Sequence, residues 1–143
     1  MGTYVYSFED TSVVISHPNF ETYSAYGTGI GSIQVSMAND VTSHDVAADL
    51  SVVVSKSVKK NGTVTFEVLQ GSDFNKFLNR LASYLENAAP AEFALATINI
   101  FNKSTGESYF CTGCSHQKRP DNQYQSQAQN RSWSWMCANI SNQ

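Results

Sequence analysis

Apolar and polar side chains alternate every second residue along most of this chain, and that period constrains the fold more than any other feature. In the run TVTFEVLQ, for example, Val64, Phe66 and Val68 share one face of an extended strand. Since successive side chains of a strand point to opposite faces, such runs predict half-buried β-strands. The strands predicted in this way are 11–17, 20–26, 32–39, 63–70, 93–102, 108–117 and 131–138.

One segment has the period of a helix instead. SDFNKFLNRLASYLENAAP, residues 72–90, places apolar residues three and four positions apart. Ser72 can cap the helix and Asp73 suits the positive end of its dipole, while Pro90 ends it. We predict an amphipathic helix over 73–88 that packs on the sheet. The apolar positions are Phe74, Phe77, Leu78, Leu81 and Leu85.

Turn residues separate these elements. Pro18-Asn19 and the polar KSTGE run, residues 103–107, predict turns between neighbouring strands. KNGT around Asn61-Gly62 predicts a further hairpin turn, because both central residues tolerate positive φ. RPDNQYQSQAQNRS predicts a polar loop. Together, these predicted strands, helix and turns indicate an α+β fold over 1–143, in which one helix packs on a mainly antiparallel, curved sheet or barrel.

Residues 38–60 do not fit this sheet. They place the apolar patch Val52, Val53 and Val54 between polar flanks, which predicts a long hairpin arm that leaves the domain. An exposed two-sided apolar run is a liability in a monomer, whereas an oligomer covers it with a neighbouring subunit. We therefore expect the arm to contact another copy.

Composition limits the function. The 143 residues carry a net charge of −3, which argues against a protein that coats nucleic acid. No apolar run approaches the roughly 18 residues that span a bilayer. MGTYVYSFED also has no basic start and no apolar segment, so neither a signal peptide nor a membrane anchor is expected. The odd cysteine count fits a reducing cytoplasm.

CTGCSHQKRPD, residues 111–121, is the stretch that most resembles a chemical site. Cys111, Cys114 and His116 supply fewer than the four ligands that zinc usually takes, and no helix follows to make a redox motif. On a strand, Cys111 and Cys114 would face opposite ways, although a bulge at Gly113 weakens that objection. Ordinary strand cysteines are favoured, with a metal-dependent enzyme as an alternative. No catalytic, cofactor-binding or metal-binding residue is predicted.

The remaining candidates are surface features. The basic groups Lys56, Lys59 and Lys60 are typical of a solvated turn or a salt-bridging contact, as is Lys118-Arg119. Trp133 and Trp135 alternate with serines, which favours core or interface aromatics over platforms for stacking bases. A small β-rich binding module with surface aromatics remains a second alternative.

The order of four segments resembles a family of bacteriophage tail tube proteins. The segments are MGTYVYSFED, the block from GIGSIQVSMAND through KKNGTVTFEVLQGSDFN, HQKRPD, and RSWSWMCANI. Together they span nearly the whole chain. Asn61 stands where the family usually has Ser or Thr.

This resemblance implies a structural subunit of a tail tube, more specifically of a contractile tail, with a fold shared by the tube protein of type VI secretion systems. It implies hexameric rings that stack into a conduit for DNA ejection. DNA would pass without specific binding, and neither a cofactor nor an enzymatic activity is implied. It also implies tail sheath, baseplate or tail-tip, and tail terminator proteins as partners. The subunit would assemble in the host cytoplasm and reside in the virion, with a type VI-like tube protein as the alternative.

Within such a tube, some residues become candidates for subunit contacts and others for the lumen. A lumen that passes DNA should carry more carboxylates than basic groups, because phosphate binding is cumulative. The contact candidates are Val52, Val53, Val54, Lys56, Lys59, Lys60, Lys118, Arg119 and Asp121. The lumen candidates are Glu67, Glu107 and Asp121.

Overall fold

The structure is a computed structural model that describes residues 10–25, 30–127 and 129–142. Residues 1–9 of the predicted family opening and Tyr26 of the second predicted strand lie outside these ranges. The elements in chain order are β1 (Thr11–Ser16), β2 (Tyr23–Ala25), β3 (Ile30–Met37), β4 (Thr42–Val46), β5 (Val52–Lys56), β6 (Gly62–Leu69), α1 (Asp73–Asn87), α2 (Pro90–Phe93), β7 (Ala96–Asn102), β8 (Ser108–Lys118) and β9 (Asn130–Asn142).

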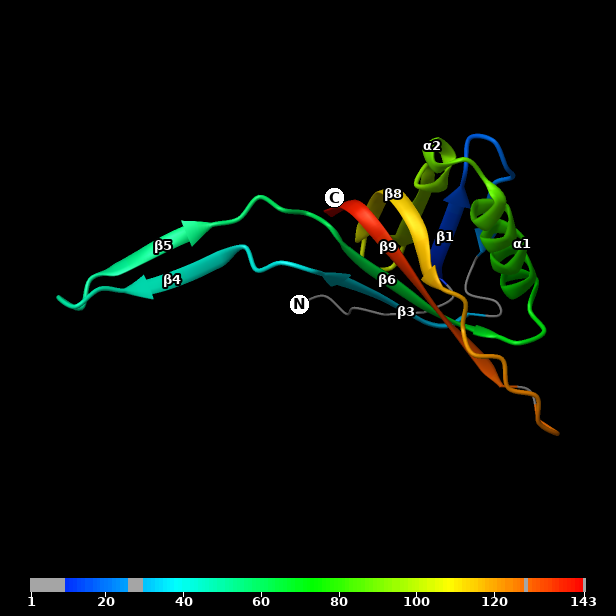
Figure 1. Cartoon of the computed structure of the whole chain (residues 1–143). Helices are drawn as coiled ribbons and strands as arrows, with labels where there is room; N and C mark the ends of the chain where they lie inside the picture. The colour runs from blue at the N-terminus through cyan, green and yellow to red at the C-terminus, as the bar shows by residue number, and fades with distance from the viewer. Residues whose placement is uncertain (1–9, 26–29, 128, 143) are drawn as a thin grey trace.

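Seven of the strands form one antiparallel sheet in the order β2-β1-β7-β8-β9-β6-β3 (Figure 1). The sheet curls strongly, because Thr11 of β1 and Ile33 of β3 line the same hollow although their strands lie near opposite edges. It is therefore a half-barrel, with α1 packed against its apolar face. The predicted α+β class and the mainly antiparallel curved sheet are confirmed.

The core lies between α1 and this apolar face. Phe66 of β6 meets Phe74 of α1 with ring centroids 5.6 Å apart, and Tyr23 stacks on Phe77 at 4.9 Å. Trp133 is fully buried, and its indole Nε1 donates a hydrogen bond of 3.0 Å to Asn75 Oδ1. The apolar face of the sheet and the apolar stripe of α1 thus pack against each other, and each buries the other.

Helix α1 begins and ends almost where its sequence signals indicate. Ser72 is the N-cap, and its Oγ accepts a hydrogen bond of 3.2 Å from the backbone N–H of Asn75. The helix ends at Asn87, and Pro90 starts the short helix α2 rather than continuing α1. Proline is well tolerated in the first turn of a helix but not in its interior, so the break follows from the sequence.

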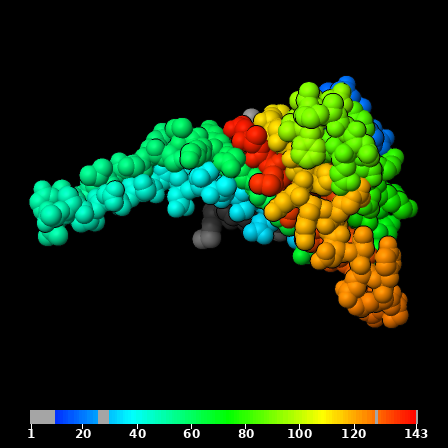
Figure 2. Space-filling view, viewed as in Figure 1, coloured from blue at the N-terminus to red at the C-terminus, as the bar shows by residue number. Residues whose placement is uncertain are grey.

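Strands β4 and β5 form a separate two-stranded sheet that projects from the body as a long arm (Figures 1 and 2). All ten residues of these two strands are exposed. The arm is closed at its root by backbone hydrogen bonds from Ser57 N to Val41 O, 2.7 Å, and from Ala38 N to Asn61 O, 3.0 Å. The predicted hairpin arm is therefore present as a folded extension with no core of its own.

The hairpin turn predicted at KNGT is wrong. Gly62 already belongs to β6, where it pairs with Met37 of β3 and Cys137 of β9. A Cβ at Gly62 would collide with Ser36 O, and it would lie 2.7 Å from Ile140 Cδ1. The glycine thus permits a close approach between three strands rather than a tight turn. The turn predicted at residues 103–107 is confirmed, with Gly106 at a φ of 76°.

Candidate assembly surfaces

The cysteines of the CTGC stretch are core residues. Gly113 has a φ of 65°, and the pairing of β8 with β7 shifts register beside it. The two-residue alternation restarts there, so Cys111 and Cys114 are both fully buried on the same face. The prediction that they face opposite ways is wrong for this reason. Cys114 Sγ lies 3.1 Å from the Sγ of Cys137 on the neighbouring strand.

Two of these cysteines, Cys111 and Cys137, are held in the neutral thiol form. Hydrogen bonding to Cys137 and then burial raise the pKa of Cys111. For Cys137, the hydrogen bond with Cys111 lowers the pKa, but the bond with Cys114 and burial outweigh it and raise the pKa to about 12. Only the thiolate form of a cysteine acts as a nucleophile or a metal ligand. Because their raised pKa values keep Cys111 and Cys137 protonated, these side chains are suited to packing instead. Among the described residues, no group of three or more His, Cys, Asp or Glu is arranged to hold a metal ion.

His116 and Arg119 tie the end of β8 to helix α1. His116 is buried, and its Nε2 lies 3.0 Å from Glu86 Oε1. Arg119 Nε donates to the same oxygen at 3.1 Å, while its Nη2 donates to Ser83 Oγ at 2.7 Å. The hydrogen bonds from Arg119 and then His116 lower the pKa of Glu86. Sequence reasoning missed Glu86, because nothing along the chain pairs it with residues some thirty positions away.

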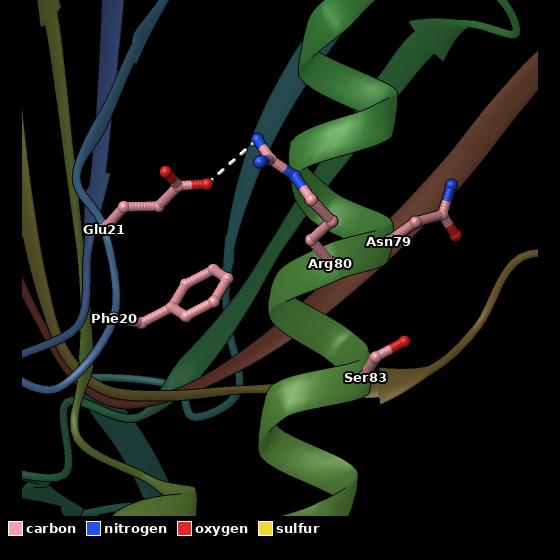
Figure 3. A pocket seen from close by; sticks show the side chains of 5 residues that line it. All are labelled: Phe20, Glu21, Asn79, Arg80 and Ser83. Carbon is pink, nitrogen blue, oxygen red and sulfur yellow. Dashed lines mark ion pairs between the residues drawn. The ribbon is translucent and has the colours of Figure 1, made fainter.

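A shallow hollow of 640 Å³ lies between α1 and the β1–β2 connection (Figure 3). Arg80 Nη2 pairs with Glu21 Oε1 across it at 2.9 Å, and the Arg80 guanidinium also lies over the Phe77 ring. Ser83 and Asn79 border the hollow, but both accept hydrogen bonds from Arg119. Its polar groups are therefore used within the chain, and its lining contains no cysteine or histidine.

The face of the sheet opposite α1 is nearly uncharged and mainly polar, with a few exposed apolar side chains, namely Leu69, Phe101, Phe110 and Met136. The pairing registers put hydroxyl and amide side chains on it, and the two charged residues that they place there are Glu67 and Lys118. The polar residues on this face include Ser32, Gln34, Ser36, Thr63, Thr65, Thr112, Ser115, Ser132 and Ser134.

The lumen candidates do not gather at one place. Glu67 is exposed on the polar face, between Ser32 of β3 and Ser132 of β9. Glu107 and Asp121 are also exposed, but they lie beyond opposite ends of β8.

The contact candidates separate into two groups. Val52, Val53 and Val54 lie on the arm with 51–63% of their surface exposed, and Lys56, Lys59 and Lys60 follow at its root. Lys118 and Asp121 are exposed near the far end of β8, where Arg119 is bound to α1. The structure therefore concentrates exposed apolar surface on the arm, next to a basic root.

The half-barrel, with α1 on its apolar face and an exposed hairpin arm, is similar in fold to chains in structures of contractile injection systems. It matches a chain in the anti-feeding prophage baseplate structure, 6-fold symmetrised, with a TM-score of 0.65 and 10% identity over 100% of this chain and 97% of that chain. It matches the anti-feeding prophage tube-terminating cap with a TM-score of 0.62 and 10% identity, over 100% and 93%. A chain in the PVC sheath/tube terminator, from an extracellular contractile injection system, gives 0.57 and 10% identity over 92% of each chain.

The chain belongs to the family described as bacteriophage PhiTE tail tube protein, whose model matches residues 1–143. Its role is therefore that of a structural component of a phage tail tube, as the resemblance in the sequence implied. No curated protein matches the sequence. None of the helices in the described ranges is long and apolar enough to cross a membrane.

Proposed function

We propose that six copies of this chain form a ring and that the rings stack into a tube through which DNA passes on ejection into the host. One observation carries the proposal: the arm is a folded, fully exposed hairpin with valines on both faces. A two-stranded hairpin is marginally stable alone, so its covering must come from another molecule. In a stacked tube, that molecule is a subunit of the adjacent ring.

The sheet supplies the second contact. Within the described residues, β2 and β3 each have one neighbour in the sheet, which leaves two edges with unpaired backbone groups. Exposed edges are a liability that closure into a barrel removes. Rings of copies joined edge to edge satisfy this need. Sixfold symmetry is supported by the 6-fold symmetrised baseplate structure, one chain of which has this fold.

The polar face of the sheet suits the lumen. Its hydroxyl and amide groups hydrate the wall, and the one lysine that the described strands place there, Lys118, is balanced by Glu67, so little net positive charge is available to hold phosphates. The expected excess of carboxylates over basic groups in the lumen stays a prediction, in which Glu67 contributes from the polar face. DNA would then pass without specific binding.

A tube of this kind would contact other tail components. We propose a sheath outside it, a baseplate or tail tip at one end and a terminator at the other, since proteins of this fold occur in baseplate and sheath/tube terminator structures. Assembly would occur in the host cytoplasm and the product would reside in the virion. Besides the arm residues, Lys118, Arg119 and Asp121 are the proposed contacts to neighbouring subunits.

Electron microscopy of the purified protein tests the proposal. We expect hollow tubes or stacked rings with sixfold symmetry, and tubes that do not retain duplex DNA at physiological salt. A stable monomer at high concentration, shown by sedimentation, would contradict the tube and favour a small binding module. Rings of another symmetry would contradict the hexamer alone.

A further inference from the structure

The two ends of the arm carry opposite charge. From Ser43 to Ser51, around the tip, the acidic residues are Asp45 and Asp49, and there is no Lys or Arg. The root carries Lys56, Lys59 and Lys60 against one nearby carboxylate, Asp40, so it has an excess of basic groups. These three lysines make no ion pair with any described residue.

The tip presents one apolar side chain in a strained turn. Leu50 has a φ of 69°, the sole positive value among non-glycine residues in the described ranges, and it is 82% exposed. It occupies the left-handed position of a tight turn in which Ala47 N donates to Ser51 O at 2.8 Å. Glycine or asparagine is the usual residue there. A leucine held in that conformation without any covering is best explained by a function for its side chain.

The turn also fixes a carboxylate beside this leucine. Asp49 Oδ1 accepts hydrogen bonds from the Oγ and the backbone N of Ser51, at 2.6 and 3.1 Å. The side-chain bond, and then the backbone bond, lower the pKa of Asp49. The tip is therefore an apolar residue with an ordered anionic neighbour, and Asp45 adds a second carboxylate on β4.

A complementary pocket lies at the root of the arm. It measures 660 Å³ and combines apolar side chains from the arm and from the body of the protein with the three root lysines. Its apolar lining is Met37, Val41, Val58, Tyr109 and Ile140. An apolar pocket bordered by ammonium groups suits a ligand with an apolar centre and flanking carboxylates.

We propose that the tip of the arm, with Leu50 as its apolar anchor, Asp49 next to it and Asp45 further along β4, docks in the root pocket of a second copy of this chain. The arm is an extended hairpin with its tip and its root at opposite ends, so the tip cannot reach the pocket of its own chain (Figure 1). Each copy thus donates one tip and accepts another. A contact of this head-to-tail kind repeats from copy to copy. The inference rests on the proposed tube and names the contact that joins its subunits.

A charge-swap experiment on the full chain tests the docking. D45K/D49K and K56E/K59E should each raise the protein concentration needed for tube assembly by about tenfold or more, since coupled charge pairs across an interface give effects of this size. A mixture of these two variants should assemble better than either alone, because the lysine tip of one meets the glutamate pocket of the other. K76E on the exposed face of α1 is the control for charge reversal and should assemble like wild type.

Leu50→Gly distinguishes docking from a structural role of the turn. Glycine relieves the positive φ, so the hairpin itself should be no less ordered, by amide hydrogen exchange. Assembly should nevertheless weaken by about tenfold through loss of the anchor. Normal assembly of L50G, or no recovery in the charge-swap mixture, would overturn the docking while wild-type tubes keep the proposed function. If wild type forms no tubes, the proposed function fails instead.

Discussion

The body and the arm both contain strands rich in apolar residues, but these side chains are buried in the body and exposed in the arm. In the body, β6 alternates buried Val64, Phe66 and Val68 with exposed or half-buried residues, and α1 covers the apolar side. In the arm, β5 carries three consecutive valines and none is covered. The body therefore contains the packing that holds it folded, whereas the arm, under the proposed function, depends on the neighbouring subunit that it contacts. Mutations should affect folding in the first region and assembly in the second.

The sharpest test of this division is to remove the arm. Val41 O and Ser57 N are already hydrogen-bonded at the root, so residues 42–56 can be replaced by a short Gly-Ser linker. We expect complete loss of tubes by electron microscopy. The free energy of unfolding of the body should change by about 0.5 kcal/mol or less, since no core residue is removed. Tubes formed by the shortened chain would contradict the division.

Truncation of one buried and one arm side chain compares the regions directly. Trp133→Ala leaves a large cavity and an unpaired Asn75 Oδ1, so it should lower the free energy of unfolding by about 3–5 kcal/mol. Val53→Ala removes a side chain that is 56% exposed and should change that free energy by about 0.5 kcal/mol or less. Urea denaturation under non-assembling conditions measures both. Equal losses would show that the arm shares the stability of the body.

Gly62→Ala tests the junction where the arm meets the sheet. The added methyl group meets Ser36 O and Ile140 Cδ1, and overpacking of this kind costs about 1–3 kcal/mol. Gly71→Ala is the matched control, because a Cβ there has no neighbour within 4 Å. Thermal unfolding of the two variants should separate them. If both unfold alike, the three strands at Gly62 have room to move apart.

Periodicity was enough to predict the sheet, the helix and the arm, because burial on one side imposes its spacing on the sequence. It failed where a glycine acts through tertiary contact. Asn61-Gly62 has the composition of a hairpin turn, but β6 pairs with β3 and β9, not with β5. Gly113 shifts the alternation in β8, so Cys111 and Cys114 share a face. Neither outcome is encoded in the local pattern.

The assembly surfaces were predictable only in part. Three consecutive valines among polar residues distinguish the arm in the sequence, because a half-buried strand alternates apolar and polar residues instead. The exposure of Leu50 and the pocket beside the root lysines depend on where the chain folds back, which no local period records. The link between Arg119, His116 and Glu86 is likewise a contact between segments about thirty residues apart. The subunit contact of Arg119 stays a prediction, and within the chain its side chain is hydrogen-bonded to α1.

The smallest expected effect concerns this link, through its dependence on pH. Because Arg119 and His116 lower the pKa of Glu86, the stability that they contribute is present above the pKa of Glu86 in the unfolded chain. It is lost as the pH falls through the lower pKa of the folded state. Arg119→Ala should therefore destabilise the body at neutral pH, by about 1 kcal/mol or less for so exposed a pair, and by less in acid.

Urea denaturation of Arg119→Ala at neutral and acidic pH measures this difference, with Lys76→Ala as control. Lys76 pairs with Asp73 at 4.0 Å, and both side chains are mostly exposed. Lys76→Ala should therefore lower the free energy of unfolding by less than Arg119→Ala does. A loss in Arg119→Ala that is the same at both pH values would show that the side chain stabilises the body by packing rather than by charge. If the variant also forms normal tubes, Arg119 belongs to the body alone, and the proposed subunit contacts at that end reduce to Lys118 and Asp121.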